Sequence, residues 1–111
     1  MFICCDLEGT CWDSGPLRGV QRQETEIIEI GAVRLGADLA VHDEFQVFVR
    51  PQRHPELSAF CTSLTSITQP QVDDAPDLPT AMASFARWIG DPAAVLVSWG
   101  PYDRNQIRRD C

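Results

Sequence analysis

Four stretches of the chain have the length and composition of β-strands. The second stretch is rich in β-branched residues, which favour strands. In the third, apolar and polar residues alternate, so that Phe45, Val47 and Val49 share one face. The short Gly-Ala-Asp link of residues 36–38 between these two stretches predicts an antiparallel hairpin. The predicted strands cover residues 2–5, 26–35, 41–50 and 94–98.

An apolar stripe with helical spacing predicts a helix between Pro79, which suits a first turn, and Gly90, which suits a C-terminal cap. The stripe consists of Leu78, Met82, Phe85 and Ile89. A shorter helix is predicted to begin after the capping residue Ser58, and another is predicted over residues 102–110. Residues 8–24, rich in Gly, Pro, Asp and Ser, are predicted to form a long loop.

The predicted order of elements is β-β-β-α-β-α, which indicates an α/β fold. The fourth strand is reached through a helix and is therefore predicted to run parallel to one of the first three. We expect a mixed sheet, with three antiparallel strands and a parallel fourth, flanked by helices. The length of 111 residues and the absence of an interior linker predict a single domain over residues 1–111.

The charge balance limits the expected partners. The chain has 16 acidic and 9 basic residues, a net charge of −7, and every basic residue is an arginine. Such a chain is a poor non-specific binder of nucleic acid, because affinity for phosphates comes mainly from Lys and Arg. It can still act on nucleic acid if some of its acidic residues hold divalent cations.

Apolar runs and cysteines bear on the compartment. The longest apolar runs are too short to cross a membrane, and no basic segment precedes the first one, so neither a membrane span nor a secretory leader is expected. Five cysteines without framework spacing are typical of reduced thiols. We therefore expect a cytoplasmic protein with no membrane partner.

Three acidic residues lie where predicted strands end. Asp6 and Glu8 follow the first strand, and Asp103 follows the fourth at the start of a helix. If these strands are parallel neighbours, the carboxylates meet at one edge of the sheet and repel one another unless a cation lies between them. Carboxylate oxygens are preferred ligands of Mg²⁺ and Mn²⁺. The structural alternatives are a solvated strand end and, for Asp103, a helix start favoured by the helix dipole.

The other acidic and histidine residues receive no catalytic role. Glu24 and Glu26 are interpreted as a solvated strand start, and Glu29 as exposed or paired. His42 and His54 lie near no nucleophile or further metal ligand in the sequence and are interpreted as surface residues.

Four segments resemble the DEDDh 3′→5′ exonucleases, which have the RNase H-like fold. Residues 5–12 (CDLEGTCW) are similar to the first exonuclease motif, Asp-x-Glu-x-Thr, and residues 98–103 (SWGPYD) to the second, whose Asp is the third metal-site acid. Residues 26–33 (EIIEIGAV) resemble the second strand of the family. Residues 61–69 (CTSLTSITQ) resemble a segment of its Eri-like branch, which includes histone-mRNA 3′-end exonucleases and KapD-like bacterial proteins.

The resemblance implies a two-metal nuclease. Asp6 would bridge two divalent cations, Mg²⁺ or Mn²⁺, and Glu8 would bind one of them. Asp103 would act on the second cation, partly through water. Two such ions stabilise the attacking hydroxide and the leaving 3′ oxygen of an in-line displacement.

The resemblance also implies a substrate. Gly9, which stands where many relatives have Ala, and Thr10 would meet the terminal 3′ hydroxyl, and Leu64 would wedge against the last bases. The substrate would be the 3′ end of single-stranded nucleic acid. The Eri-like segment favours RNA over DNA, and the product would be a nucleoside 5′-monophosphate.

The family's last motif has no counterpart in residues 1–111. In the family a His acts as general base, and an Asp five residues later completes the first metal site. The sequence continues for eight residues after Asp103, and His42 and His54 both precede the fourth strand. We therefore expect an incomplete exonuclease domain without the last strand and helix. By itself it would have little or no activity and low stability or solubility.

Two other functions fit part of the sequence. The chain could bind nucleic acid or a protein without hydrolysis, as a pseudo-exonuclease. Residues 6–10 also resemble the nucleophile loop of haloacid-dehalogenase-like phosphatases, in which Asp6 would attack phosphorus. Glu8 has the wrong length for the second acid of that loop, a predicted hairpin follows, and the chain has no lysine for the usual cationic position.

Overall fold

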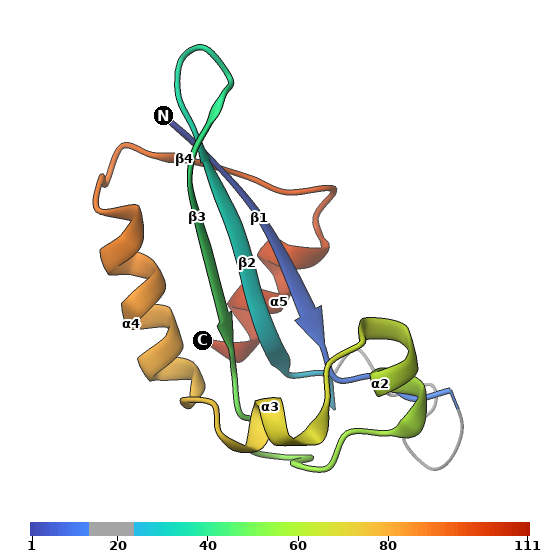
Figure 1. Ribbon diagram of the computed structural model, residues 1–111. Helices are drawn as coiled ribbons and strands as arrows, with labels where there is room; N and C mark the ends of the chain where they lie inside the picture. The colour runs from blue at the N-terminus through green and yellow to red at the C-terminus, as the bar shows by residue number, and fades with distance from the viewer. Residues whose placement is uncertain (14–23) are drawn as a thin grey trace.

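A four-stranded sheet with helices around it is the frame of the protein (Figure 1). The computed structural model describes residues 1–13 and 24–111, so residues 14–23 of the predicted loop lie outside the described residues. The strands are β1 (Phe2–Gly9), β2 (Ile27–Leu35), β3 (Val41–Phe48) and β4 (Val95–Val97), and the helices are α2 (Ala59–Thr65), α3 (Gln69–Asp73), α4 (Leu78–Ile89) and α5 (Tyr102–Asp110).

The strand order β3-β2-β1-β4 confirms the predicted mixed sheet. β1, β2 and β3 pair antiparallel, and a hydrogen bond of 2.9 Å from Leu39 N to Gly36 O helps to close the turn between β2 and β3. β4 runs parallel to β1. The β1–β4 pairs are Phe2 with Val95, Ile3 with Leu96 and Cys4 with Val97.

β1 is longer than the sequence pattern predicts. Its apolar run ends at Asp6, yet pairing with β2 continues through Glu8, opposite Glu29, to Gly9. The register shifts at this end, where Ile28 has no partner in β1. Asp6 and Glu8 therefore lie on a strand rather than in a loop, and their spacing of two residues places them on one face of the sheet.

α4 and α5 pack against one apolar cluster of the sheet. The predicted α4 stripe is confirmed, because Phe85 is 2% exposed and the other three residues of the stripe pack against the same cluster. The Phe85 ring lies 5.2 Å from that of Phe45 in β3, and Ile107 of α5 joins them. The buried members are Ile3, Leu7, Ile27, Ile30, Ala32, Val49, Ala81 and Phe85.

A smaller apolar cluster joins α2 and α3 to the bulged end of the sheet. Ser58 caps α2 as predicted, with its Oγ accepting a hydrogen bond of 2.9 Å from Cys61 N. α3 is not among the predicted helices and begins after Thr68, whose capping box with Gln71 is a local signal for a helix start. The buried members of this cluster are Ile28, Cys61, Ile67 and Val72.

Two aspartates fix α5 to the strands. At its last turn, Asp110 Oδ2 accepts a hydrogen bond of 2.8 Å from Ile27 N, at the start of β2. At its first turn, Asp103 accepts a hydrogen bond from the backbone amide of Leu7, in β1. One backbone amide of β1 and one of β2 are thus paired with side chains of the helix.

Arg34 ties the end of α4 to the sheet. Its guanidinium donates to the backbone oxygens of Trp88 and Ile89, with a distance of 3.1 Å to Ile89 O. The same group lies 4.4 Å from the centre of the Trp88 ring. Arg34 therefore supplies partners for carbonyls that the end of a helix leaves unpaired.

The structure also bears on the predictions about cysteine thiols and membrane spans. All five cysteines are free, as predicted, and Cys61 is buried. In the two described ranges, no helix is both long and apolar enough to cross a membrane. Exposed apolar side chains occupy all of β4, at the edge of the sheet.

We predict that Phe85→Ala lowers the free energy of unfolding by about 3–5 kcal/mol, because it opens a cavity between α4 and the sheet. Urea denaturation measures this loss. Phe2→Ala is the matched control, since the Phe2 ring is already 38% exposed and should lose clearly less. Equal losses for the two variants would contradict the assigned core.

Candidate functional site

The β1–β4 pairing brings the three predicted carboxylates to one end of the sheet. Ile3 and Leu7 of β1 point into the core, so Asp6 and Glu8 point to the opposite face. Asp103, in the first turn of α5, is only 4% exposed. Its hydrogen bond with the Leu7 amide places its carboxylate at the edge of β1, between the positions of the other two acids.

The three carboxylates carry like charges that act on one another. Burial raises the pKa of Glu8, and the charges of Asp6, Glu29 and Asp103 raise it further. Burial and the charge of Asp6 also raise the pKa of Asp103, although the Leu7 amide lowers it in part. Among the described residues, no ion pair includes Asp6, Glu8 or Asp103. Repulsion of this kind is relieved by protons or by bound cations.

The donor set fits hard divalent cations. Mg²⁺ and Mn²⁺ prefer carboxylate oxygens, and each of the three acids supplies two. In the described part of the chain, no three His, Cys, Asp or Glu residues are grouped closely enough to form a ready coordination set. The oxygen ligands and negative charges of the three acids therefore suit a cation, although the described residues do not form a complete coordination shell.

A pocket of about 570 Å³ lies beside Glu8 and brings together the predicted substrate residues. Gly9 and Thr10 line it from the end of β1, and Leu64 lines it from α2. Such a volume is within the usual range of small-molecule sites. Leu64 is 66% exposed, so its apolar side chain is available to a ligand.

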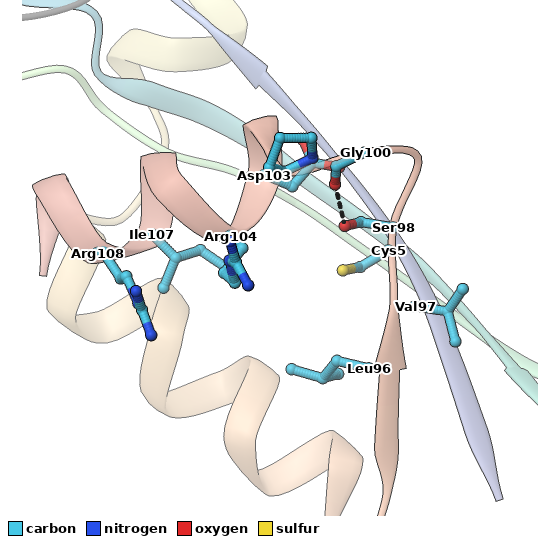
Figure 2. A pocket seen from close by; sticks show the side chains of 10 residues that line it. Cys5, Leu96, Val97, Ser98, Gly100, Asp103, Arg104, Ile107 and Arg108 are labelled. Carbon is cyan, nitrogen blue, oxygen red and sulfur yellow. Dashed lines mark hydrogen bonds between the residues drawn. The ribbon is translucent and has the colours of Figure 1, made fainter.

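Asp103 lines a second cavity, of about 730 Å³, between β4 and α5 (Figure 2). Leu96, Cys5 and Ile107 give this cavity a largely apolar wall, and Ser98 Oγ donates a hydrogen bond of 3.1 Å to Gly100 O at its rim. The predicted site residues are thus divided. Glu8 and the substrate residues line the smaller pocket, Asp103 lines the larger cavity, and Asp6 is exposed on the sheet face.

Gly9 and Thr10 hold the end of β1 against the start of β2. Thr10 N donates to Glu26 O, and Thr10 Oγ1 accepts from Glu26 N, each at 2.9 Å. A Cβ on Gly9 would lie 2.6 Å from Thr25 Cγ2 and 3.2 Å from the Tyr102 hydroxyl oxygen. Neighbouring side chains therefore fill the space that an Ala at position 9 would need.

α5 supplies a wall of the smaller pocket that the sequence analysis does not assign. Tyr102, Asn105, Gln106 and Arg109 line the pocket. Their spacing of three, four and seven residues along the helix puts them on one stripe. Because this stripe is polar, apolar periodicity does not reveal it. The helical spacing of its polar residues is the sequence signal that could have indicated a shared face.

Two interpretations of polar residues are wrong. Glu26 is not a solvated strand start, because its carboxylate accepts hydrogen bonds from the backbone amides of Gln52, Arg53 and His54 at 2.7–3.1 Å. His54 is half-buried, with its Nε2 3.0 Å from Glu24 Oε2. These contacts join segments about 26–30 residues apart, which no local pattern reveals.

His42 is exposed, as predicted, in the hairpin of β2 and β3. Its Nε2 lies 3.2 Å from Asp38 Oδ1. Glu29, interpreted as exposed or paired, accepts a hydrogen bond of 2.9 Å from Gln46 across the sheet.

Known exonucleases are similar to this chain. An exonuclease family model matches residues 3–108. ERI1 exoribonuclease 2 of Danio rerio is 48% identical over 89 residues, which cover 79% of this chain and 15% of that protein. Human 3′-5′ exoribonuclease 1 is 41% identical over 90 residues, which cover 79% of this chain and 25% of that protein. The chain thus spans a quarter or less of these two relatives.

A solved structure confirms the predicted fold class. The crystallographic structure of the nuclease domain of 3′hExo, a DEDDh family member, bound to rAMP, superposes with a TM-score of 0.87. The two chains are 33% identical, and the superposition covers 99% of this chain and 57% of that one. The RNase H-like mixed sheet expected from the sequence is therefore present.

We predict that Gly9→Ala destabilises the protein by about 1–3 kcal/mol, because the new methyl group overpacks the space beside Thr25. Thermal or urea unfolding measures the change. Thr25→Ser, which removes Cγ2 and keeps the hydroxyl, should recover most of the loss in the double variant. A double variant no more stable than Gly9→Ala would refute this contact.

We predict that Asp103→Asn raises the unfolding temperature of the cation-free protein by several degrees. The amide removes a buried charge that the fold disfavours and keeps an oxygen for the Leu7 amide. Asp74→Asn, at an exposed position, is the control and should leave the midpoint unchanged. A lower midpoint for Asp103→Asn would show that its charge stabilises the fold.

Proposed function

The chain belongs to the exonuclease family whose model matches residues 3–108, and from this premise we propose that Asp6, Glu8 and Asp103 hold the divalent cations of a 3′→5′ exonuclease. The substrate is the 3′ end of a single-stranded nucleic acid, and the products are nucleoside 5′-monophosphates. One observation carries the proposal. Asp6, Glu8 and Asp103 lie together at one end of the sheet, no ion pair among the described residues includes them, and Glu8 lines a pocket of nucleotide size.

Each acid has a separate role in this proposal. Two bound divalent cations, Mg²⁺ or Mn²⁺, would supply an activated hydroxide and stabilise the leaving 3′ oxygen. Asp6 lies on the exposed face of β1 and is proposed as the ligand shared by both ions. Glu8 would hold one ion from the side of the pocket. Asp103, fixed by the Leu7 amide, would act on the other, partly through water.

The pocket suits the last nucleotide of a strand. An unpaired 3′ end can enter a pocket of this size, whereas the inner nucleotides of a duplex are stacked and paired. Leu64 offers an apolar surface to a base of any sequence. Gly9 and Thr10 would meet the terminal 3′ hydroxyl at the end of β1. RNA is favoured over DNA, because the relatives include proteins named exoribonucleases.

The 111 residues supply no histidine at this pocket. His42 pairs with Asp38 in the β2–β3 hairpin, and His54 pairs with Glu24. A general base must lie within hydrogen-bond reach of the attacking water. We therefore propose that the 111-residue chain by itself hydrolyses slowly or not at all and retains the binding of a pseudo-exonuclease. The antiparallel β2–β3 hairpin after β1 gives no support to the phosphatase alternative.

We predict that the protein, in the longest form its gene encodes, shortens a 5′-labelled RNA stepwise from its 3′ end when Mg²⁺ or Mn²⁺ is added. Asp6→Asn and Glu8→Gln should each slow the reaction at least about a hundredfold, since a lost cation ligand costs several kcal/mol of transition-state stabilisation. Gel electrophoresis of the products measures the rates.

Glu44→Gln is the matched control, because Glu44 is an exposed acid of β3 outside the pocket. It should leave the rate unchanged. Absence of shortening, or equal rates for Asp6→Asn and the unmodified protein, would overturn the proposed function. If the longest form binds the RNA in a metal-dependent way without shortening it, that form is also a pseudo-exonuclease.

A further inference from the structure

One arginine lies in the wall of the smaller pocket. Among the described residues that line it, Glu8 and Arg109 are the only charged ones. Glu8 stands at the end of β1, and Arg109 in the last turn of α5. The pocket thus has a carboxylate on one element and a guanidinium on another. Arg109 is absent from the residues that the family resemblance assigns.

Gln106 fixes the position of the Arg109 side chain. Gln106 is fully buried, and its Nε2 donates to Thr25 O at 2.8 Å and to Asp110 Oδ1 at 3.0 Å. Both of its N–H groups are therefore occupied, which leaves its Oε1 as an acceptor. Arg109 Nη2 donates to that oxygen at 2.5 Å. The buried Gln106 amide is therefore fixed by hydrogen bonds on its nitrogen, and its oxygen holds the Arg109 guanidinium.

The rest of the guanidinium remains available to a ligand. Arginine carries five side-chain N–H donors, and among the described residues the Arg109 side chain donates a hydrogen bond to Gln106 alone. Arg109 is exposed, and no ion pair between described residues includes it. Burial raises the pKa of Tyr102 in the wall of this pocket, and the charge of Arg109 offsets part of that rise.

A nucleotide is the ligand that this arrangement fits. It has acceptor atoms on the phosphate, the sugar and the edge of the base, and the pocket already contains an exposed apolar side chain, Leu64, for the face of a base. We propose that Arg109 is a substrate-binding residue that donates hydrogen bonds to the nucleotide held in this pocket. Gln106 is its positioning residue. This inference rests on the proposed function.

The chain contains a matched control on the same helix. Arg108 carries the same charge and precedes Arg109 by one residue, but it lines the cavity between β4 and α5 (Figure 2) and not the smaller pocket. Arg108→Ala and Arg109→Ala therefore change the net charge equally, but only Arg109→Ala removes a guanidinium from the smaller pocket.

The test measures binding of the four nucleoside 5′-monophosphates, which are products and are not hydrolysed further. Calorimetric titrations with Mn²⁺ present compare the unmodified protein, in the longest form its gene encodes, with Arg109→Ala and Arg108→Ala. We expect Arg109→Ala to weaken binding about ten- to a hundredfold, as for the loss of a charge-assisted hydrogen bond, and Arg108→Ala to bind normally. Arg109→Gln is included, because it keeps a donor for Gln106 while removing the charge and preserves the fold if Arg109→Ala does not.

The pattern of the loss identifies the acceptor. A loss that differs among the four bases, largest for guanine with its O6 and N7 acceptors, places the acceptor on the base. An equal loss for all four, which diminishes as the salt concentration rises, places it on the phosphate. Either pattern supports the proposal, as does a matching increase of KM with little change in kcat on RNA.

Two results would overturn the proposal while the proposed function stands. One is normal binding by folded Arg109→Ala or Arg109→Gln, and the other is an equal loss for Arg108→Ala, which would indicate a general charge effect. If the unmodified protein neither binds the nucleotides nor shortens RNA, the proposed function itself fails, and this inference fails with it.

Discussion

The parallel pairing of β4 with β1 is the constraint on which the site depends. Only three residue pairs join the two strands, and on that side no described strand pairs with the second half of β1. The chain then turns at residues 98–101, so that α5 begins beside this unpaired edge. Asp103 accepts the hydrogen bond of the Leu7 amide there. One hydrogen bond therefore gives the Leu7 amide a partner and holds an acid of the candidate site in place.

The same arrangement carries an electrostatic penalty. Glu8 and Asp103 are partly or largely withdrawn from water near Asp6 and Glu29, and their raised pKa values express how unfavourable their charges are. Elsewhere acidic side chains have clear structural roles, as Glu26 has with three backbone amides. A fold that leaves like charges uncompensated at one place is typical of a binding site, where stability is lost in exchange for ligand affinity.

Local signals in the sequence predict most helices and strands. The features that they do not predict depend on contacts between residues far apart in the sequence. The α4 stripe, the Ser58 cap and the β2–β3 turn each depend on residues within a few positions of one another, and each is confirmed. The extension of β1 to Gly9 depends instead on pairing with β2, some twenty residues away. The meeting of the three carboxylates at one end of the sheet could be predicted, because they follow apolar strands and match a family motif. The tight space at Gly9 and the polar wall of α5 could not, since Thr25, Tyr102 and the end of β1 meet only in the folded chain.

We propose that β1 and α5 hold a divalent cation jointly, and a titration with Mn²⁺ followed by electron paramagnetic resonance measures this binding. The signal of free Mn²⁺ reports how much of the ion the protein binds. We expect saturable binding by the unmodified protein and a large loss of affinity in both Glu8→Gln and Asp103→Asn, which lie on the two different elements. Absence of Mn²⁺ binding, or full affinity in either variant, would contradict it.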